Sequence, residues 1–360
     1  MAGPRRAVRH LLGERRAVSD EDAGLLIYEQ IWRAAAAEVG AEVRDLGSGF
    51  LEIARAGHKL RVRRNLVALD DPVTLRLVGD KPVVHRLLAD AGLPVPEYLA
   101  FDRRELSPAL DFLELRPPCV VKPAFATGRG RGVTCGVESP NDLRRAAAWA
   151  ARWGRELLIE RQGQGEEYRV LVLDGEVLDV LRRRPPRVTG DGRSTIAELI
   201  EAENGRRAAS GGGDGLFPID IDLDCLLTLR SEGLSLDSVP ARDATVVVKR
   251  AANENGPREN ESVADAAGAG FRGQMRAAAT ALGVRLASIE VIAPGIQQPL
   301  EDCGGTIIEV NTTPGLHYHY QLSEARGGEM GSRTAVPVAV PILRRLLRLG
   351  EQIGDTRART

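Results

Sequence analysis

The sequence Ile-Ile-Glu-Val-Asn-Thr-Thr-Pro-Gly at residues 307–315 is the most informative segment of the chain. Side chains two positions apart on a strand point to the same face, so Glu309 and Asn311 project together while Ile308 and Val310 project into the opposite layer. An acid beside a carboxamide, followed by a Pro-Gly stop, is typical of a site that holds Mg²⁺ against phosphate oxygens. The alternative is an ordinary strand with a polar outer face, and the rest of the chain must decide between the two.

The composition excludes several classes of protein. With 360 residues the chain is long enough for about two or three lobes around a large core. Its formal net charge of −1 indicates neither a nucleic-acid partner nor an anionic membrane surface, and no apolar run is long enough to span a membrane. The Arg-rich residues 1–16 lack the apolar core of a signal peptide. The cysteines form no Cys-x-x-Cys pair, which argues against a zinc site or disulfide framework and favours the reducing cytoplasm.

Apolar periodicity and turn signals predict an α+β chain rather than a regular βαβ alternation. The strongest local signal is a hairpin, because residues 168–173 and 176–181 alternate in polarity around Asp174-Gly175. Residues 205–244 are expected to be mobile at their front. The other predicted elements are helices over 23–38, 82–91, 140–153, 195–204, 263–282 and 336–349, and strands near 42–45, 50–54, 60–62, 119–123, 133–137, 157–160, 245–249 and 285–292.

Asp220, Asp222 and Asp224 alternate like the start of a calcium-binding loop. Such a loop needs a glycine at its sixth position and a glutamate at its twelfth, and both are missing here. Ile221 and Leu223 interleave with the acids, so the pattern predicts an amphipathic edge strand instead.

A nucleotide site is suggested by Lys122, which ends an apolar strand and faces a loop that contains Gly128, Gly130 and Gly132. Glycines let backbone N–H groups approach phosphate oxygens closely, and a lysine ammonium supplies a point charge. The spacing fits neither a Walker loop nor a dinucleotide fingerprint. By itself, the loop is also compatible with a flexible turn and solvated arginines.

Glu160 closes a further strand and is followed by a glycine-rich acidic segment with Glu167 at its end. A crossing between two lobes offers backbone groups to an adenine edge and a carboxylate to a ribose. A surface acidic turn is the alternative interpretation.

Arg169 and Arg183 lie on the two arms of the predicted hairpin. Arginines that face a transferring phosphoryl group stabilise its spread negative charge, although either one alone is also readily explained as a solvated cation. Glu290 sits inside an apolar strand, where an acid is costly unless it is paired or binds metal. Together with Glu309 and Asn311 it would hold one or two Mg²⁺ ions.

Taken in order, these residues resemble the ATP-grasp carboxylate–amine ligases, and most of all the ATP-grasp module of cyanophycin synthetase and related amino-acid or peptide ligases. The similarity runs from about residue 75 to residue 346. It is carried by Asp80-Lys81, Val121-Lys122-Pro123, Gly128–Val133, Glu167–Val172, Arg183, Val188–Ile196, Ala252-Asn253, Glu309-Val310-Asn311 and Pro314-Gly315.

The resemblance implies an ATP-grasp fold, in which two α/β lobes clasp ATP, preceded here by a short N-terminal α/β entry domain. The expected segments are the entry domain at 1–77, a small lobe with the glycine-rich lid at 78–163, a large lobe with the metal site at 164–350 and a tail at 351–360. The second ligase module of cyanophycin synthetase has no counterpart here, so iterative building of an Asp-Arg polymer is not expected.

The resemblance also implies roles for the candidate residues. Those for the ATP phosphates, adenine and ribose are Lys81, Lys122, Gly128, Gly130, Gly132, Glu160 and Glu167. The catalytic pair at the γ-phosphate or acyl phosphate is Arg169 and Arg183, and the Mg²⁺ ligands, with Mn²⁺ able to substitute, are Glu290, Glu309 and Asn311.

The substrate-binding candidates are His319, Arg193 and Asn253. His319 stands where relatives keep a histidine near the acceptor, and Arg193, with Arg258 and Arg326, is a candidate for a substrate carboxylate. His317 and His319 alternate with tyrosines, and such a pair after a turn lines a polar pocket more often than it binds metal.

The expected function is that of an ATP-dependent ligase that joins a carboxylate to an amine through an acyl phosphate. Its expected partners are small amino acids or short peptides in the cytoplasm, with no nucleic acid and no membrane, and a homo-oligomer is left open. Two alternatives remain: a non-catalytic ATP-binding module, and a phosphotransferase that stops at a phosphorylated product.

Overall fold

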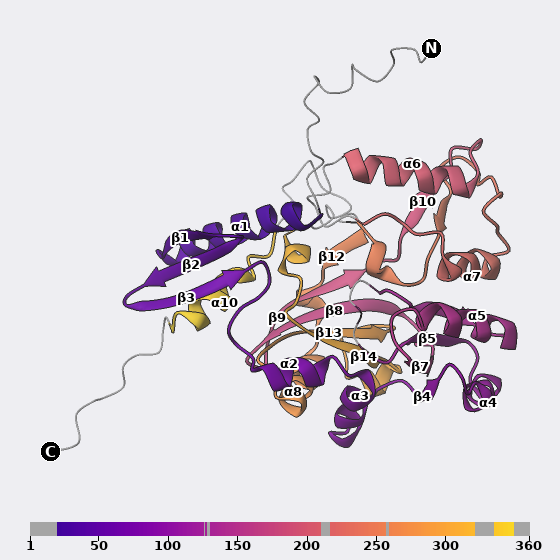
Figure 1. Cartoon of the computed structure of the whole chain (residues 1–360), viewed down its shortest axis with the longest axis horizontal. Helices are drawn as coiled ribbons and strands as arrows, with labels where there is room; N and C mark the ends of the chain where they lie inside the picture. Colours follow the sequence, from indigo (N-terminus) through magenta and orange to yellow (C-terminus); the bar gives the residue numbers. More distant parts are fainter. Residues whose placement is uncertain are drawn as a thin grey trace, which may run out of the picture.

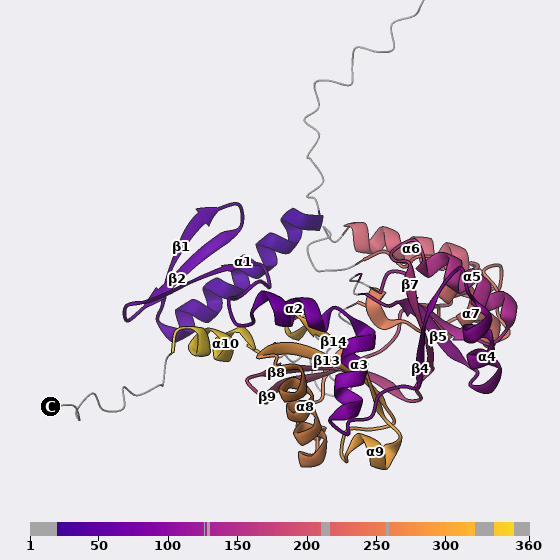
Figure 2. The same ribbon diagram turned by 60° about the horizontal axis from the view of Figure 1, so that its bottom comes forward.

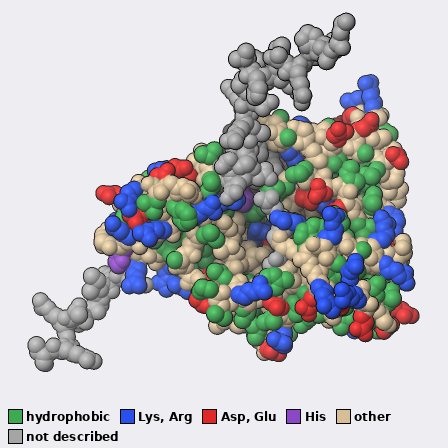
Figure 3. All heavy atoms as spheres, in the orientation of Figure 1, with side chains coloured by type: hydrophobic (Ala, Val, Ile, Leu, Met, Phe, Trp, Pro, Cys, Tyr) green, Lys and Arg blue, Asp and Glu red, His purple; other side chains and the backbone are tan. Residues whose placement is uncertain are grey.

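The structure is a computed structural model of the chain. It describes residues 20–125, 127, 130–209, 217–256, 259–320 and 335–348. Within these ranges the strands form antiparallel sheets flanked by α-helices, which confirms the predicted α+β class (Figure 1). No helix in the described ranges is both long and apolar enough to cross a membrane. On the face shown in Figure 3, acidic and basic side chains are interspersed.

A five-stranded sheet with the order β12-β9-β8-β13-β14 forms the centre of the molecule. The predicted hairpin is confirmed, since β8 and β9 pair around Asp174-Gly175. Helix α8 packs against β8 and β9, and α3 packs against α8 and β14. The strands are β8 (Glu166–Leu173), β9 (Glu176–Arg183), β12 (Asn260–Ser262), β13 (Leu286–Ala293) and β14 (Thr306–Thr312), and the helices are α3 (Lys81–Asp90) and α8 (Ala269–Leu282).

Alternation along these strands produces two different faces. Val170 and Ile289 belong to the back face and share a core with Met275 of α8 and Leu88 of α3. Figure 2 shows α8 on the side of this sheet opposite to α1. Residues of the front face change character along the strands, from the charged Glu167, Arg169 and Glu290 at one end to the buried Leu171, Leu173 and Leu286 at the other.

The apolar end of the front face is covered by the N-terminal elements and the last described helix. Leu171, Leu173 and Leu286 share a core with Trp32 and Ile53. Figure 1 shows α10 beside α1 and the first sheet, although the two helices lie at opposite ends of the chain. These elements are α1 (Asp20–Val39), β1 (Glu42–Gly47), β2 (Phe50–Arg55), β3 (His58–Arg63) and α10 (Ala339–Leu346).

A four-stranded sheet with the order β4-β7-β5-β6 forms a second body. Val121 and Ile159 are fully buried in a core with α4 and α5. Their neighbours Lys122 and Glu160 therefore point to the opposite side of this sheet. The elements are β4 (Tyr98–Asp102), α4 (Ser107–Leu115), β5 (Cys119–Pro123), β6 (Thr134–Val137), α5 (Pro140–Ala150) and β7 (Glu156–Arg161).

Two short helices, α2 (Pro72–Val78) and α3, lie in the chain between β3 of the first sheet and β4 of the four-stranded sheet. The side chains of Asp71 and Asp80 cap α2 and α3, and each helix has a proline in its first turn, as is common at helix starts. The predicted boundary at residue 78 assigns α3 to the small lobe, yet Val84 and Leu88 pack in the core of the five-stranded sheet. The domain limits stay predictions, and α3 packs with the five-stranded sheet.

The described parts of residues 187–249 form a small unit with its own core, built from β10 (Arg187–Thr189), α6 (Ile196–Ala209), α7 (Leu223–Ser231) and β11 (Thr245–Val247). The edge strand predicted for Asp220 to Asp224 is wrong, because Asp222 caps α7 and Asp224 lies in its first turn. An N-cap aspartate satisfies a free N–H of the first turn, which outweighs the weak alternation. Part of the segment predicted to be mobile, 210–216, lies outside the described residues.

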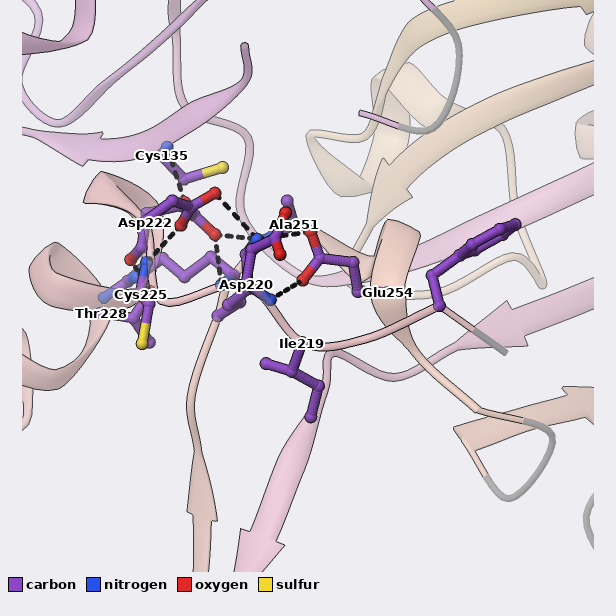
Figure 4. Close-up of polar contacts among 12 residues, drawn as sticks. Cys135, Ile219, Asp220, Asp222, Cys225, Thr228, Ala251 and Glu254 are labelled. Carbon is purple, nitrogen blue, oxygen red and sulfur yellow. Dashed lines mark hydrogen bonds and ion pairs between the residues drawn. The ribbon is translucent and has the colours of Figure 1, made fainter. Parts of the chain in front are cut away.

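The buried carboxylate of Asp224 connects this unit to the four-stranded sheet. It accepts hydrogen bonds from the backbone N–H groups of Cys135 at 2.8 Å, Arg250 at 3.1 Å and Ala251 at 3.2 Å. Figure 4 shows how Cys135, Ala251 and the residues around α7 converge at this point. The contact matters for the site because the strand that follows the glycine-rich loop and the segment 249–253 are held by one side chain.

The remaining described elements are short. The helix predicted over 263–282 begins only at Ala269, because a separate 3₁₀ turn, η3, precedes it. The other pieces are η1 (Ala252–Glu254), η3 (Ala264–Ala266), α9 (Leu300–Cys303) and η4 (Leu316–His319).

We predict that Asp224→Ala lowers the free energy of unfolding by about 3–5 kcal/mol, because three backbone N–H groups lose their hydrogen-bond acceptor. Urea denaturation measures the change. Asp237→Ala, an exposed aspartate of the same unit, is the matched control and should stay within about 0.5 kcal/mol of the parent. Equal effects of the two substitutions would contradict the role of Asp224.

Candidate active site

A cavity of about 450 Å³ lies where the four-stranded sheet, the five-stranded sheet and the N-terminal elements meet. Its size is that of a small-molecule site. Among the predicted site residues, those that line it are Lys81, Lys122, Gly130, Glu160, Glu167, Arg169, Asn253, Glu290, Glu309 and Asn311. Tertiary structure thus collects candidates that are spread over more than half of the chain.

One end of the cavity is formed by Lys122 and Glu160 of the four-stranded sheet. Their side chains form an ion pair at 2.7 Å, and the Lys122 ammonium also donates to the carbonyl of Ile308 at 3.2 Å. Both residues are less than a tenth exposed. His85 of α3 lies 3.7 Å from the same Glu160 carboxylate, and burial lowers its pKa, so it is neutral at ordinary pH.

The middle of the cavity wall carries the predicted magnesium ligands on two paired strands. Glu290 of β13 lies directly opposite Glu309 of β14. Asn311 donates to Glu290 at 3.0 Å, and Lys81 of α3 pairs with Glu309 at 3.0 Å. Burial raises the pKa of Glu309, but Lys81 and its other partners outweigh burial and lower it to about 2.

These residues fit a magnesium ion by their chemistry. Two carboxylates and a carboxamide oxygen are hard ligands that leave further positions to water and phosphate. Glu309 stays ionised, as a ligand must be. No group of three or more His, Cys, Asp or Glu suited to a metal occurs in the described ranges, and the predicted set contains only two such residues beside the amide.

The hairpin arginines occupy different positions relative to the cavity. Arg169 lines it and pairs with Glu290 at 2.5 Å. Arg183 lies behind the wall with its side chain 1% exposed, where it pairs with Glu167 at 2.6 Å and donates to the carbonyl of Ala252 at 2.9 Å. Burial raises the pKa of Glu167, although Arg183 opposes that shift.

The glycine-rich loop approaches the cavity at Gly130, which has a φ of +65°. A Cβ atom there would lie 2.1 Å from the side-chain nitrogen of Asn253, so only glycine fits this close approach without a shift of that side chain. Gly132, at φ +81°, packs in the same way against Pro123 and Trp153. Gly128 lies outside the described residues.

Two predicted substrate-binding residues are corrected by the structure. His319 does not line the cavity, because its side chain is fully buried and its Nδ1 lies 2.6 Å from the carboxylate of Asp179. Arg193 is exposed on the turn before α6 and lies outside the cavity lining. Their positions follow from the 3₁₀ turn η4 and from the small unit, neither of which local sequence patterns revealed. Arg258 and Arg326 lie outside the described residues.

The far end of the cavity contains residues that sequence reasoning largely missed. Tyr28, Arg64 and Asn65 come from the N-terminal elements and line it beside His317 and Tyr318. The prediction that His317 and His319 line a polar pocket is confirmed for His317 only. No motif marks the other three, because their proximity depends on how α1 and the first sheet pack against the five-stranded sheet.

Comparison with known proteins identifies the family. The family model described as D-ala D-ala ligase C-terminus matches residues 87–190. Cyanophycin synthetase of Trichormus variabilis is 31% identical over 252 residues, which cover 69% of this chain and 28% of that protein. The glutathione biosynthesis bifunctional protein GshAB of Mannheimia succiniciproducens is 30% identical over 288 residues, which cover 77% of this chain and 38% of that protein. The chain belongs to the ATP-grasp ligase family.

Structural comparison supports the ATP-grasp fold that the sequence predicted. The bifunctional glutathione synthetase from Pasteurella multocida superimposes with a TM-score of 0.53 and 25% identity, over 88% of this chain and 44% of that one. The ATP-grasp chain spans less than half of these relatives. Its own activity is therefore a matter for proposal.

We predict that His317 makes the ATP-grasp chain less stable in acid. Burial and the nearby Arg169 lower its pKa from 6.5 to about 3, so the unfolded chain binds the proton first. Its neutral form therefore contributes stability above pH 6.5, which is lost as the pH falls from 6.5 towards 3. Near pH 5 the contribution falls by about 1.4 kcal/mol per pH unit.

Urea denaturation of His317→Gln at pH 7.5 and pH 5 checks this expectation. The variant should lose less stability than the parent between the two pH values. His58→Gln, which changes an exposed histidine, should behave as the parent does. Parallel losses in the parent and in His317→Gln would show that His317 does not contribute.

Proposed function

We propose that this ATP-grasp chain is an ATP-dependent ligase that joins a carboxylate to an amine and releases ADP and phosphate. The observation that carries the proposal is one cavity in which Lys81, Lys122, Arg169 and the predicted Mg²⁺ ligands lie together. The names of its relatives, a synthetase of cyanophycin and a glutathione biosynthesis protein, support amino acids or short peptides as substrates.

The proposed reaction has two steps. An oxygen of the substrate carboxylate attacks the γ-phosphorus of ATP, the bond to the bridging oxygen breaks, and ADP leaves. An amine then attacks the carbonyl carbon of the acyl phosphate, loses a proton, and expels inorganic phosphate. The protein supplies no covalent nucleophile, so its work is to align the reactants, neutralise charge and exclude water.

Different residues at the cavity would bind the ATP phosphates, Mg²⁺ and the transferring phosphoryl group. Lys122 and Lys81 would hold the ATP phosphates, and Gly130 would bring backbone N–H groups towards them. Glu290, Glu309 and Asn311 would hold one or two Mg²⁺ ions, which polarise phosphate oxygens when bound. Arg169 would stabilise the charge on the transferring group, while Arg183 would act from behind by fixing Glu167.

The first test is ADP release with Mg-ATP and a panel of amino acids and dicarboxylic acids, with hydroxylamine as the amine. A hydroxamate from one acid would demonstrate an acyl phosphate and identify the carboxylate donor. A stable phosphorylated product without hydroxamate would favour a phosphotransferase. Bound ATP without turnover over the whole panel would favour a non-catalytic module and contradict the proposal.

We predict that Glu309→Ala lowers turnover by on the order of 100-fold to 1,000-fold, because a charged ligand of the transition state is lost. The same assay with the donor from the panel measures it, and circular dichroism reports whether the fold is kept. Glu201→Ala changes an exposed glutamate on α6 and is the matched control. Turnover equal to that of the parent in Glu309→Ala would contradict the assignment of Glu309 as a Mg²⁺ ligand of the active site.

A further inference from the structure

Arg64 has an unusual position at the far end of the cavity. Reciprocal backbone hydrogen bonds between Arg63 and Leu66 close a tight turn in which Arg64 and Asn65 are the central residues. Arg64 has a φ of +52°, at a position where hairpin turns of this kind favour glycine. An arginine there costs on the order of 1 kcal/mol in backbone strain, and such residues persist where the surroundings hold them.

The turn is fixed from two sides. The buried indole of Trp32 donates to the carbonyl of Arg64 at 2.8 Å, and the Asn65 amide donates to the carbonyl of Thr313. Thr313, after β14, is itself at a φ of +50°, which is rare for a β-branched residue. Two strained backbone positions therefore meet where the N-terminal elements touch the end of the central sheet.

Among the described residues of the cavity wall, no acid is left to serve as a counter-ion for Arg64. Each acidic residue of the wall already has a basic partner, in the pairs Glu160–Lys122, Glu167–Arg183, Glu290–Arg169 and Glu309–Lys81. Arg64 forms no ion pair with any residue that the structure describes. The Nε atom of Arg64 is buried and has no hydrogen-bond partner among the described residues. An unsatisfied buried donor is costly, and an anionic ligand would satisfy it.

Among the residues that the structure describes, the other groups at this end add no negative charge. Tyr28 contacts His317, whose ring lies 4.0 Å from that of Tyr318, and Arg169 lies over Tyr318 at 4.8 Å. His317 is neutral, because burial, Arg169 and Arg64 all disfavour its protonation. The described surroundings of Arg64 are therefore neutral or cationic, which suits a carboxylate.

Strand β14 separates Arg64 from the end of the cavity that Lys122 and Glu160 form, where the ATP phosphates would bind. Ile308 contacts Lys122, and Thr313, five residues later, contacts Asn65. At about 3.3 Å per residue the two contacts lie roughly 16 Å apart, with Glu309 and Asn311 between them. In a phosphoryl transfer the attacking and leaving oxygens lie in line, so the acid must approach from the side away from ADP. That is the side of Arg64.

We propose that Arg64 binds a substrate carboxylate that does not react, so that the N-terminal elements supply part of the substrate site. The proposal rests on the function proposed above and makes its substrate class specific: an amino acid or dipeptide with a free carboxylate besides the reacting groups. A guanidinium binds a carboxylate through two parallel hydrogen bonds, which a lysine cannot form.

Binding measurements that need no turnover test this proposal. Thermal shift and calorimetry with Mg²⁺ and a non-hydrolysable ATP analogue would compare the common amino acids and their dipeptides with the matching α-amides. The parent should bind at least one acid in preference to its amide. In Arg64→Gln the apparent Kd for that acid should rise about 10-fold to 100-fold, while the Kd for its amide should change less than about 2-fold.

Two further variants separate binding from folding. Arg64→Gly removes the cation and relieves the turn, so it should lose the preference for the acid while its Tm equals or exceeds that of the parent. Arg63→Gln changes the neighbouring arginine, whose side chain donates to the carbonyl of Ser48 and does not line the cavity. It should keep the preference of the parent.

The possible outcomes distinguish the two proposals. A parent without any preference for an acid, or an unchanged preference in Arg64→Gln, would overturn the role of Arg64. Weaker binding of the ATP analogue in Arg64→Gln, equal for acid and amide, would place Arg64 at the nucleotide and also overturn it. An Arg64-dependent preference without ADP release from Mg-ATP would support the subsite and contradict the ligase function.

Discussion

Ion pairing on the front face of the five-stranded sheet is the interaction on which the rest of the site depends. The carboxylate of Glu290 is buried and that of Glu309 is partly buried, and a charge in such a position is costly unless a partner compensates it. Their partners come from different segments, Arg169 from the hairpin and Lys81 from α3. The sheet, the hairpin and α3 are therefore held in one arrangement by the groups that would act in chemistry.

The same face serves two purposes along its length. Its charged end forms the wall of the cavity, and its apolar end, with Leu171 and Leu286, is the surface on which the N-terminal elements pack. Because that packing is extensive, the turn at Arg64 is fixed relative to Glu309. The N-terminal elements, which local patterns describe only as an entry domain, therefore form a wall of the site. Their Arg64 is a candidate for substrate selection.

Asp224 plays a comparable part on the other side of the cavity. It holds the strand after the glycine-rich loop and the segment before Asn253 with one buried carboxylate. Asn253, two residues after Ala251, is also the residue that Gly130 approaches closely. Asp222 and Asp224, which first suggest an edge strand, serve instead as a helix cap and a cross-linking group, because a helix N-terminus and backbone N–H groups bind their oxygens.

The sequence alone determined the α+β class, the β8–β9 hairpin and the collection of acids, lysines and glycines that marks an ATP-grasp chain. These features are local, since strand alternation, turn residues and motif spacing act over a few residues. Tertiary structure alone decided three other features. His319 is buried against Asp179, Arg193 lies outside the cavity, and Arg64 lines the cavity. They depend on which faces of distant elements pack together, and it is this packing that brings Asn65 into contact with Thr313.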